Sequence, residues 1–401
     1  MKAVVKYGKG KGMVEIQDIP EPKIERDDDV LIEVKGVSVC GSDLHIYHDS
    51  HPYWPPVVLG HEFSGVIADV GKGVKGWKKG DRIVSETRTG SCGVCYTCQS
   101  GFPQVCEQKR AYGIGINGAY TKYVVGPARL LHRLPDNVSF GVGAVVEPTA
   151  ICVTSILERC GLQAGESVVI TGPGPIGLIS LAIAKAAGVK MVGVTGRSSD
   201  EGVRFGKARE LGADFTVNVD KENPVERVFE MTGGLGVDIL IETSGGAKAI
   251  FQAFDMVRRL GRVCAIGISG REEVPVPGIS LAASVNTPGA DAPGSVIFGS
   301  LLRGRFRTSS DGRSSNISIL SGSHTRAAAK ISPPLSAGFS AVPPEGSVPD
   351  PGAGSKFPAS VPPGTPPEAG IISLVSSTMS PILISGMDIR STSTQSGDST
   401  G

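Results

Sequence analysis

The sequence has almost no excess of charge of either sign and no long hydrophobic run. Forty Lys and Arg side chains face 39 Asp and Glu side chains, which gives a formal net charge of +1. Such a balance provides no general attraction to nucleic acid or to an anionic membrane surface. No stretch of eighteen consecutive apolar residues is present to span a bilayer. We therefore expect no nucleic-acid partner and no membrane partner.

The start of the chain also lacks the pattern of a signal peptide. Met1-Lys2-Ala3-Val4-Val5 begins like a strand, without a long apolar segment behind a basic one. The eight cysteines all lie before residue 265, and cysteines three apart in an otherwise thiol-poor chain are poor partners for a secreted disulfide framework. Reduced thiols that bind metal would fit a cytoplasmic location, which we expect.

The last part of the chain has few residues that build a core. Beyond Pro277 there is no Cys, Trp or Tyr, and half of the 28 prolines lie there. Such a composition buries little apolar surface, so we expect residues 278–401 to be disordered or loosely held. The abrupt loss of pattern has two interpretations, a natural extension or a frame-shifted translation, and we favour the frame shift. Translating the other reading frames of the encoding DNA distinguishes them.

What the sequence does contain begins with four closely spaced cysteines, Cys92, Cys95, Cys98 and Cys106. The spacing C-x2-C-x2-C-x7-C lets four thiols surround one tetrahedral ion, and thiolates are the preferred ligands of structural zinc. Disulfides between cysteines three apart would make a poor framework. An iron–sulfur run also begins C-x2-C-x2-C but continues x3-C-P, whereas Glu107 follows the last cysteine here. The motif predicts a structural zinc site.

A second set of candidate metal ligands lies upstream. Cys40 follows an apolar run, Val30–Val39, that is typical of a strand, and His61 and Glu62 lie in a G-H-E-x2-G-x5-G segment. A cysteine, a histidine and a carboxylate are the mixed ligand set of a catalytic zinc with an open fourth position. Cys40 or His61 alone would be typical of a buried core residue. Their occurrence together with the other motifs favours metal binding.

A third motif predicts a dinucleotide site. The β-branched run Glu166–Thr171 is typical of a buried strand, and an apolar stretch of helical length, Leu178–Ala187, follows it closely. A G-x-G-x-x-G run is weak evidence alone, but between a strand and a helix it is the dinucleotide fingerprint. Its backbone can approach a pyrophosphate, and the helix N-terminus offers unpaired N–H groups. The residues of this turn are Gly172, Gly174, Pro175, Ile176 and Gly177.

Together the three motifs resemble those of the zinc-dependent medium-chain dehydrogenases, the family of alcohol, sorbitol and threonine dehydrogenases. The resemblance covers roughly residues 1–277. It implies an α/β chain with a GroES-like β-barrel catalytic domain over residues 1–148 and a Rossmann domain over residues 149–277. The Rossmann domain would hold a doubly wound parallel sheet, incomplete at its C-terminal end, before the atypical tail. The active site would lie in the cleft between the two domains.

The resemblance also implies roles for single residues. Cys40 and His61 match the catalytic zinc ligands, and Ser42 and His45 match the proton relay. The third ligand stays open between Glu62 and Glu147, either of which could contact the metal or its bound water. The four cysteines of the C-x2-C-x2-C-x7-C motif match the structural zinc lobe one for one. We therefore expect two Zn²⁺ ions, one catalytic and one structural.

The substrate signals point in two directions within this family. Glu147 stands where the alcohol dehydrogenase branch carries a cysteine, which argues against that branch. Ile46-Tyr47 follows the relay histidine as in threonine dehydrogenases, whereas sorbitol dehydrogenases have a tyrosine directly after it. We expect a secondary alcohol or polyol as the small-molecule substrate. Zinc would lower the pKa of its hydroxyl, and the nicotinamide would accept the hydride.

The end of the second expected strand bears on which nicotinamide cofactor binds. Strand Lys190–Thr195 ends in Gly196-Arg197-Ser198, with no carboxylate there to hold a ribose 2′-hydroxyl, because Asp200 comes later. Glycine leaves space, and arginine supplies a fork of donors that suits a 2′-phosphate. We therefore favour NADP, with NAD as the alternative. A competing interpretation has Arg197 stacked on the adenine or lying in solvent.

A second hypothesis of a different class is an inactive remnant that binds zinc and nucleotide without turnover. Relatives use the C-terminal region to form homo-oligomers, and residues 278–401 do not match that ending. We therefore do not expect this chain to assemble as they do. Measuring NADP⁺ reduction with a panel of polyols and diols, with and without chelator, separates the two hypotheses.

Overall fold

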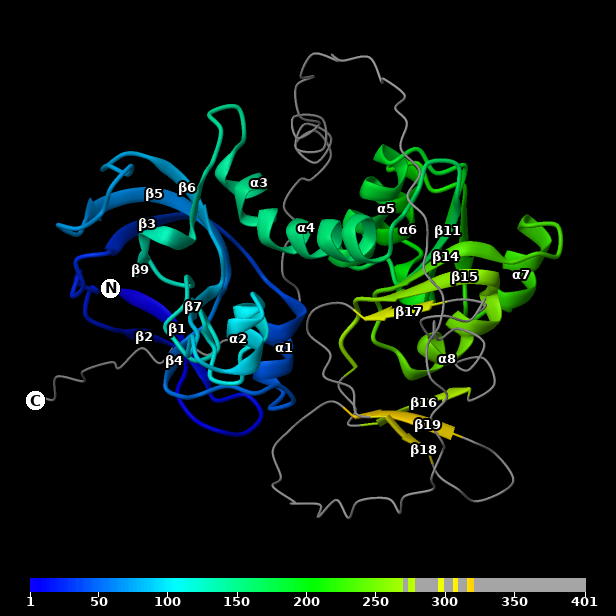
Figure 1. Cartoon of the computed structure of the whole chain (residues 1–401), viewed down its shortest axis with the longest axis horizontal. Helices are drawn as coiled ribbons and strands as arrows, with labels where there is room; N and C mark the ends of the chain where they lie inside the picture. The colour runs from blue at the N-terminus through cyan, green and yellow to red at the C-terminus, as the bar shows by residue number, and fades with distance from the viewer. Residues whose placement is uncertain (270–272, 278–294, 299–305, 309–315, 321–401) are drawn as a thin grey trace, which may run out of the picture.

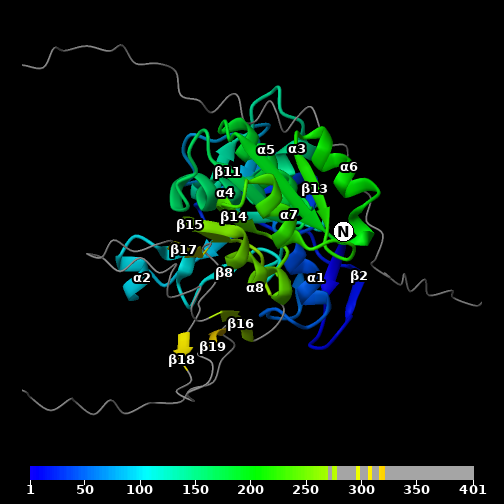
Figure 2. The same cartoon turned by 90° about the vertical axis from the view of Figure 1, so that its right-hand side faces the viewer.

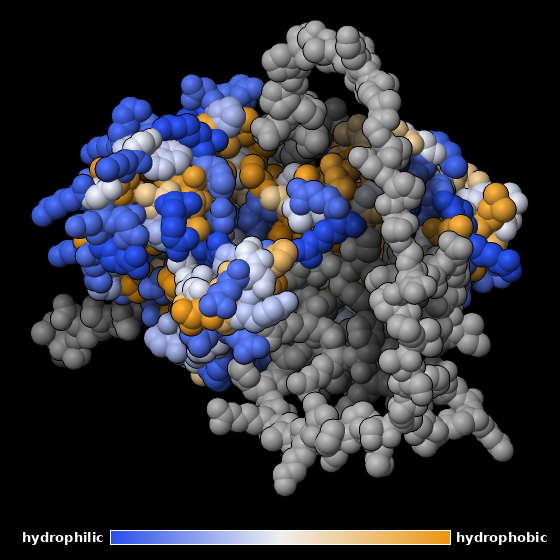
Figure 3. Space-filling view, in the orientation of Figure 1, coloured by the Kyte–Doolittle hydropathy of each residue, from blue (hydrophilic) through white to orange (hydrophobic). Residues whose placement is uncertain are grey.

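The structure is a computed structural model that describes residues 1–269, 273–277, 295–298, 306–308 and 316–320. Most of the tail that we expect to be disordered lies outside these residues. Two units lie side by side, and helix α4 (Val146–Val153) runs between them (Figure 1). Among the coloured residues of the face seen in Figure 3, hydrophilic ones predominate, with hydrophobic ones scattered between them. Within the described ranges, no helix has the length and apolar character needed to cross a membrane.

The first unit is built from antiparallel strands. Its largest sheet has the order β10-β6-β5-β3-β9, a second has the order β2-β1-β4, and β7 pairs with β8. The strands are β1 (Lys2–Lys6), β2 (Val14–Asp18), β3 (Asp29–Ser38), β4 (Val57–Val58), β5 (Glu62–Val70), β6 (Arg82–Ser85), β7 (Arg88–Gly90), β8 (Arg110–Ala111), β9 (Tyr123–Pro127) and β10 (Leu131–Arg133).

Alternating side chains of the largest sheet form the core of this unit. Val30 and Ile32 of β3 are fully buried and pack with Phe63 and Ile67 of β5, while Leu31, between the first two, is only partly buried. Short helical segments lie around the sheets: α1 (Gly41–Tyr47), α2 (Tyr96–Gln99), η1 (Pro103–Val105), η2 (Ala128–Leu130) and α3 (Phe140–Ala144). The structure confirms the all-β first unit that the sequence predicts.

The second unit is a parallel sheet with the strand order β13-β12-β11-β14-β15-β17. The order reverses between β11 and β14, which is where sheets of this kind bind ligands at the carboxyl ends of their strands. The elements are β11 (Ser167–Thr171), α5 (Pro175–Ala186), β12 (Met191–Gly196), η4 (Ser198–Asp200), α6 (Val203–Glu210), β13 (Phe215–Asn218), α7 (Pro224–Met231), β14 (Val237–Glu242), α8 (Ala247–Met256), β15 (Val257–Ala265) and β17 (Ser295–Phe298).

Both faces of the parallel sheet are covered, as the continuous apolar strands predict (Figure 2). In β11, Val168 and Ile170 pack on the face covered by α4 and α5, and Val169 packs on the face covered by α7 and α8. The all-buried pattern of β11 follows from this two-sided packing. The doubly wound sheet expected from the sequence is therefore present.

Two details differ from the elements expected from sequence. The linking helix, which the sequence predicts over Pro148–Cys160, begins at Val146, and its second part, η3 (Thr154–Arg159), is π-helical. The sheet also continues beyond residue 277, because β17 pairs in parallel with β15. The described part of the C-terminal region adds a three-stranded sheet beside α8 with the order β16-β19-β18, formed by β16 (Glu273–Pro277), β18 (Phe306–Thr308) and β19 (Asn316–Leu320).

Candidate metal and cofactor site

The four cysteines of the first motif come together in a small lobe. Each offers a sulfur, and the four sulfurs all lie within 4.8 Å of one another. The Sγ–Sγ distance is 3.6 Å from Cys106 to Cys92, 3.8 Å from Cys95 to Cys106 and 4.0 Å from Cys92 to Cys98. Four sulfurs at zinc-bond lengths of about 2.3 Å in a tetrahedron lie about 3.8 Å apart. The thiols are not in disulfides, and their arrangement fits a tetrahedral zinc ion.

The backbone of the lobe supports the charge of these sulfurs. The Cys92 N–H donates to Cys106 Sγ at 3.4 Å, and the Cys95 N–H donates to Cys92 Sγ at 3.3 Å. Hydrogen bonding with the Thr97 hydroxyl, and then with the backbone of Cys98, lowers the pKa of the Cys95 thiol to about 6. These contacts favour the thiolate form, which is the form that binds metal.

The second group of ligands is formed where β3 and β5 pair. Cys40 lies two residues after the end of β3 and is the N-cap of α1, while His61 precedes β5 and Glu62 begins it. Ser38 and Glu62 are paired in the antiparallel register. The candidate ligand atoms of Cys40, His61 and Glu62 lie within 4.8 Å of one another. The structure therefore brings together three residues that the sequence singles out.

A glycine before His61 makes this placement possible. Gly60 has a φ of +92°, and a Cβ built on it would lie 2.3 Å from the ring of Tyr120. Any larger residue would strain the backbone and displace the tyrosine. The glycine of the G-H-E segment therefore fixes the direction in which His61 enters the group.

A layer of polar residues surrounds the Cys40–His61–Glu62 group. Asp43 is fully buried, its Oδ1 lies 3.6 Å from His61 Nδ1, and its Oδ2 accepts a hydrogen bond from Tyr120 Oη at 2.8 Å. The Ser38 hydroxyl donates to Glu62 Oε2. A carboxylate beside the ring nitrogen of a histidine is the usual support for a metal-binding imidazole. Asp43 and Tyr120 are not among the site residues predicted from the sequence, although Asp43 lies within the C-G-S-D-L-H motif.

The electrostatics of this group favour a cation. Burial by itself would lower the pKa of His61, but the Cys40 side chain and the carboxylates of Asp43 and Glu147 raise it to about 10. Asp43 Oδ1 and His61 Nδ1 are buried without a hydrogen-bond partner of good geometry. Negative groups that stabilise a protonated imidazole also stabilise a divalent ion in the same place. The donor set therefore fits zinc.

The second candidate glutamate, Glu147, lies near this group but is not one of its three closely spaced members. Burial raises the pKa of Glu147 to about 7, His61 lowers it and Glu62 raises it. Glu147 belongs to α4, and in the same helix the Cys152 thiol donates to the Ile176 carbonyl of the glycine turn at 3.7 Å. Helix α4 thus reaches both the Cys40–His61–Glu62 group and the glycine turn, because Glu147 and Cys152 lie about 7.5 Å apart along its axis.

Ser42 and His45 occupy different environments on α1. Ser42 is buried, and its Oγ lies 3.3 Å from His61 Nε2. His45 is partly exposed, and its Nδ1 lies 3.2 Å from Ser50 Oγ. Residues three apart lie on one side of a helix, so both side chains follow the same face. A further histidine that the sequence analysis missed, His51, is close enough for the charges of His45 and His61 to lower its pKa, after the larger effect of burial.

The glycine motif forms a tight turn between β11 and α5. Gly172 has a φ of +94°, and a Cβ on Gly177 would lie 1.9 Å from the Gly172 carbonyl oxygen. Gly174 is the N-cap of α5, Pro175 follows at the first helical position, and a Cβ on Gly174 would meet nothing within 4 Å. The close contact between Gly172 and Gly177 holds β11 and α5 together, and the open side of Gly174 leaves room for a phosphate. Ile176 lies in the first turn of α5 and is partly buried against the core.

The end of β12 differs from the sequence expectation. The Arg197 N–H donates to Asp200 Oδ2 at 2.9 Å, and the Ser198 N–H donates to Asp220 Oδ2 at 2.9 Å. Arg197 Nε also lies 3.7 Å from Asp220 Oδ1. Two carboxylates therefore lie at the strand end where the sequence predicts none, Asp200 from η4 and Asp220 from the loop after the neighbouring strand β13.

The chain is similar to known proteins in both of its units. The family model of the alcohol dehydrogenase GroES-like domain matches residues 26–136, and that of the zinc-binding dehydrogenases matches residues 175–305. A sorbitol dehydrogenase of Halalkalibacterium halodurans is 39% identical over 274 residues, which are 68% of this chain and 79% of that protein. An L-threonine 3-dehydrogenase of Bacillus velezensis is 38% identical over 65% of this chain and 75% of its own length.

A solved structure shows the same architecture. A zinc-binding dehydrogenase from Sinorhizobium meliloti bound to NADP superimposes with a TM-score of 0.64 at 32% sequence identity. The match covers 70% of this chain and 80% of that one. The likeness therefore includes both the all-β unit and the parallel sheet.

Proposed function

Because the chain belongs to the zinc-dependent medium-chain dehydrogenases, we propose that it transfers a hydride between a secondary alcohol or polyol and a nicotinamide cofactor, with NADP preferred over NAD. The observation that carries this proposal is the Cys40–His61–Glu62 group, joined through α4 to the glycine turn. The proposal assigns the catalytic zinc to these three residues. The structural zinc is assigned to the four-cysteine lobe.

When bound, zinc would polarise the substrate hydroxyl and the nicotinamide would accept the hydride. The residues of the chain hold these groups and move the proton. Asp43 orients the His61 ring from behind, at 3.6 Å from Nδ1. The Ser42 hydroxyl, buried beside His61, takes the proton from the substrate side. His45, on the same face of α1 and partly exposed, passes it to water.

The cofactor lies across the turn formed by Gly172, Gly174, Pro175, Ile176 and Gly177 in this proposal. The open side of Gly174 and the N-terminus of α5 receive the pyrophosphate. Arg197, with an exposed side chain at the end of β12, receives the 2′-phosphate of NADP, with Gly196 and Ser198 on either side. The NADP-bound relative supports this cofactor.

The experiment measures reduction of NADP⁺ and NAD⁺ with sorbitol, threonine and vicinal diols, together with the zinc content of the protein. We expect two zinc ions per chain, turnover that a chelator abolishes, and a higher kcat/KM for NADP⁺. Bound zinc and bound cofactor without turnover on any substrate would favour the inactive remnant instead. That alternative has one specific observation behind it, because the family match ends at residue 305. A higher kcat/KM for NAD⁺ would contradict the cofactor assignment alone.

A further inference from the structure

The ends of β12 and β13 lie together at one edge of the parallel sheet. Gly196 is the register partner of Asn218, and the Val219 N–H donates to the Gly196 carbonyl at 2.9 Å. The loops that follow β12 and β13 therefore lie next to each other. In sheets of this class, that edge is where a dinucleotide binds.

Asp220, in the loop after β13, contacts both residues that follow Gly196. Its Oδ2 accepts from the Ser198 N–H at 2.9 Å, and its Oδ1 lies 3.7 Å from Arg197 Nε. The Asp220 N–H donates to Asn218 Oδ1 at 3.0 Å, which holds the loop in place. The Ser198 N–H and, more weakly, Arg197 keep the pKa of Asp220 below its usual range against the opposing effect of burial.

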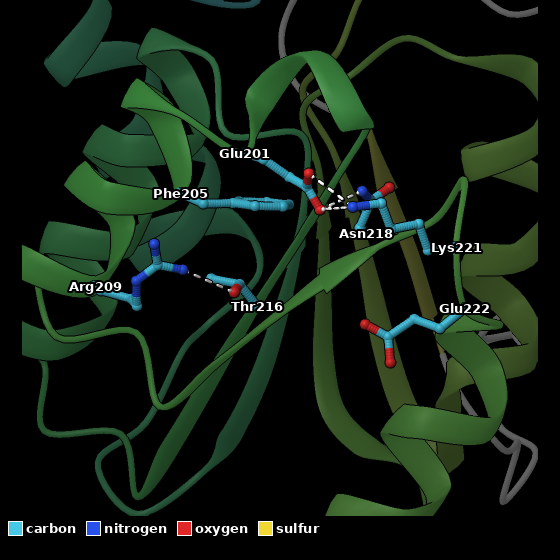
Figure 4. Close-up of a pocket in the computed structure, with 7 residues that line it drawn as sticks. All are labelled: Glu201, Phe205, Arg209, Thr216, Asn218, Lys221 and Glu222. Carbon is cyan, nitrogen blue, oxygen red and sulfur yellow. Dashed lines mark hydrogen bonds and ion pairs between the residues drawn. The ribbon is translucent and has the colours of Figure 1, made fainter.

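The neighbouring carboxylates form ion pairs with cations other than Arg197. Asp200 lies 2.8 Å from the Arg204 guanidinium, and Glu201 lies 2.8 Å from Lys221 Nζ. Figure 4 shows Glu201 turned toward Asn218 and Lys221 beside a shallow pocket, with the Glu222 carboxylate turned away from them. Among the ion pairs of the described residues, Asp220 makes one, with Arg197. Asp220 is thus the carboxylate that competes for the arginine.

An acidic side chain in place of Gly196, the last residue of β12, would not fit. A Cβ on Gly196 would lie 2.8 Å from the Phe205 ring and 2.9 Å from Pro173. The acidic group that is missing from β12 therefore reaches the strand end from β13.

Building on the proposed function, we propose that Asp220 is a specificity-determining residue that sets the ratio of NADP to NAD binding. Its carboxylate accepts the ribose 2′-hydroxyl of NAD. The same carboxylate occupies the Ser198 N–H and the Arg197 side chain, which are the donors that a 2′-phosphate needs. When NADP binds, its 2′-phosphate must displace the Asp220 carboxylate from these donors and lie close to the negative charge of that carboxylate. Asp220 therefore limits the preference for NADP that Arg197 gives.

The test is Asp220→Asn, with binding of NADP⁺ and of NAD⁺ measured by calorimetry on the full chain without substrate. We expect the dissociation constant of NADP⁺ to fall about tenfold, and that of NAD⁺ to rise, when the charge is removed. Asp220→Ser, which keeps an acceptor for the Ser198 N–H, should shift the ratio in the same direction. Glu222→Gln is the matched control, because it removes the same charge two residues away and should leave the ratio unchanged.

A second measurement checks that Asp220 acts through the arginine. In an Arg197→Ala background, Asp220→Asn should improve NADP⁺ binding by a smaller factor than in the wild type. The reason is that the Arg197–Asp220 ion pair, which a 2′-phosphate would have to break, is already absent. Equal changes for both cofactors in Asp220→Asn, or an equal shift in Glu222→Gln, would overturn the role of Asp220. Wild-type protein that binds neither cofactor would contradict the proposed function itself and this role with it.

Discussion

At the scale of single residues, the two glutamates near His61 differ in their surroundings. Glu62 is buried, begins strand β5 and receives a hydrogen bond from the Ser38 hydroxyl. Glu147 lies on α4, where burial raises its pKa to about 7. Only Glu62 shares the compact group with Cys40 and His61 within the described residues. A strand position tied to its partner is a firmer place for a metal ligand than a neighbouring helix.

The first prediction follows from this difference. Glu62→Gln should lose the catalytic zinc and retain the structural one, whereas Glu147→Gln should retain both. A neutral amide at the first position removes the anionic oxygen from the ligand set, and at the second it leaves that set intact. Zinc content per chain, measured by elemental analysis after gel filtration, distinguishes the variants. Loss of zinc from Glu147→Gln with retention in Glu62→Gln would reverse the assignment.

Sequence reasoning predicts the ligands themselves better than the residues that support them. Cys40, His61 and Glu62 lie in recognisable motifs, so their types and spacing point to metal. Tyr120 supports the same group through Asp43 from a distant part of the chain, and nothing in its local sequence reveals this. Asp220 was missed for the same reason, since the pairing of β12 with β13 brings it to Arg197.

At the scale of elements, the four-cysteine lobe has little other support. Its helix α2 has four residues and no buried side chain, and Val94 and Tyr96 are 75% and 84% exposed. Without a hydrophobic core of its own, the lobe is expected to depend on the proposed structural zinc for its shape.

The second prediction concerns that dependence. Cys98→Ser should lower the zinc content by one ion per chain and make the segment around residues 92–106 sensitive to limited proteolysis. Cys160→Ala, which removes a buried thiol outside both ligand groups, should change neither measurement. Unchanged zinc in Cys98→Ser would show that the lobe is held in another way.

A buried carboxylate connects two central strands of the parallel sheet. Asp238 of β14 accepts from the Ser167 N–H at 2.7 Å and from the Ser167 hydroxyl at 2.6 Å, and its Oδ1 lies 2.7 Å from Arg258 Nε. Burial would raise the pKa of Asp238, but the Ser167 and Arg258 contacts outweigh it and hold the pKa below its usual range.

The third prediction uses the sign of that shift. A folded-state pKa below the unfolded value of about 3.9 means that the stabilisation is complete above that pH and is lost as the pH falls below it. Asp238→Asn should therefore lower the free energy of unfolding by about 2 kcal/mol at neutral pH. Thermal unfolding should show the gap between variant and wild type closing below pH 4. A gap that is the same at pH 7 and in acid would contradict the role of the ionised carboxylate.

At the scale of the whole molecule, the ligand group and the cofactor turn belong to different units and meet through α4. The sequence predicted both units because each has a strong periodic pattern, alternating in the first and continuously apolar in the second. It did not predict the π-helical continuation of α4 or the strand β17, which lies beyond the change in composition at Pro277. The pairing of β17 with β15 is a tertiary contact, which a local pattern does not contain.

The fourth prediction tests whether the two sites bind independently. Saturating cofactor at a hundred times its dissociation constant should stabilise the wild type by about 2.7 kcal/mol. His61→Ala should lose the catalytic zinc and all turnover and still show the same stabilisation by cofactor, since the glycine turn is on the other unit. Differential scanning fluorimetry with and without cofactor measures this stabilisation in the wild type and in the variant. Loss of the cofactor effect in His61→Ala would mean that metal and dinucleotide bind as one unit.

The two ligand groups also differ in how much of the chain each one requires, and this has a consequence for synthesis on the ribosome. The cysteine lobe closes within Cys92–Cys106, so it can take its ion soon after that segment emerges. The other group rests on the hydrogen bond from Tyr120 to the Ser38 carbonyl, 82 positions apart, and on that from Ser38 to the Ala144 carbonyl, 106 positions apart. It cannot be complete until Ala144 has been translated. If both proposed zinc ions bind, a nascent chain is therefore expected to acquire them in sequence, with the lobe loaded while the Cys40–His61–Glu62 group is still incomplete.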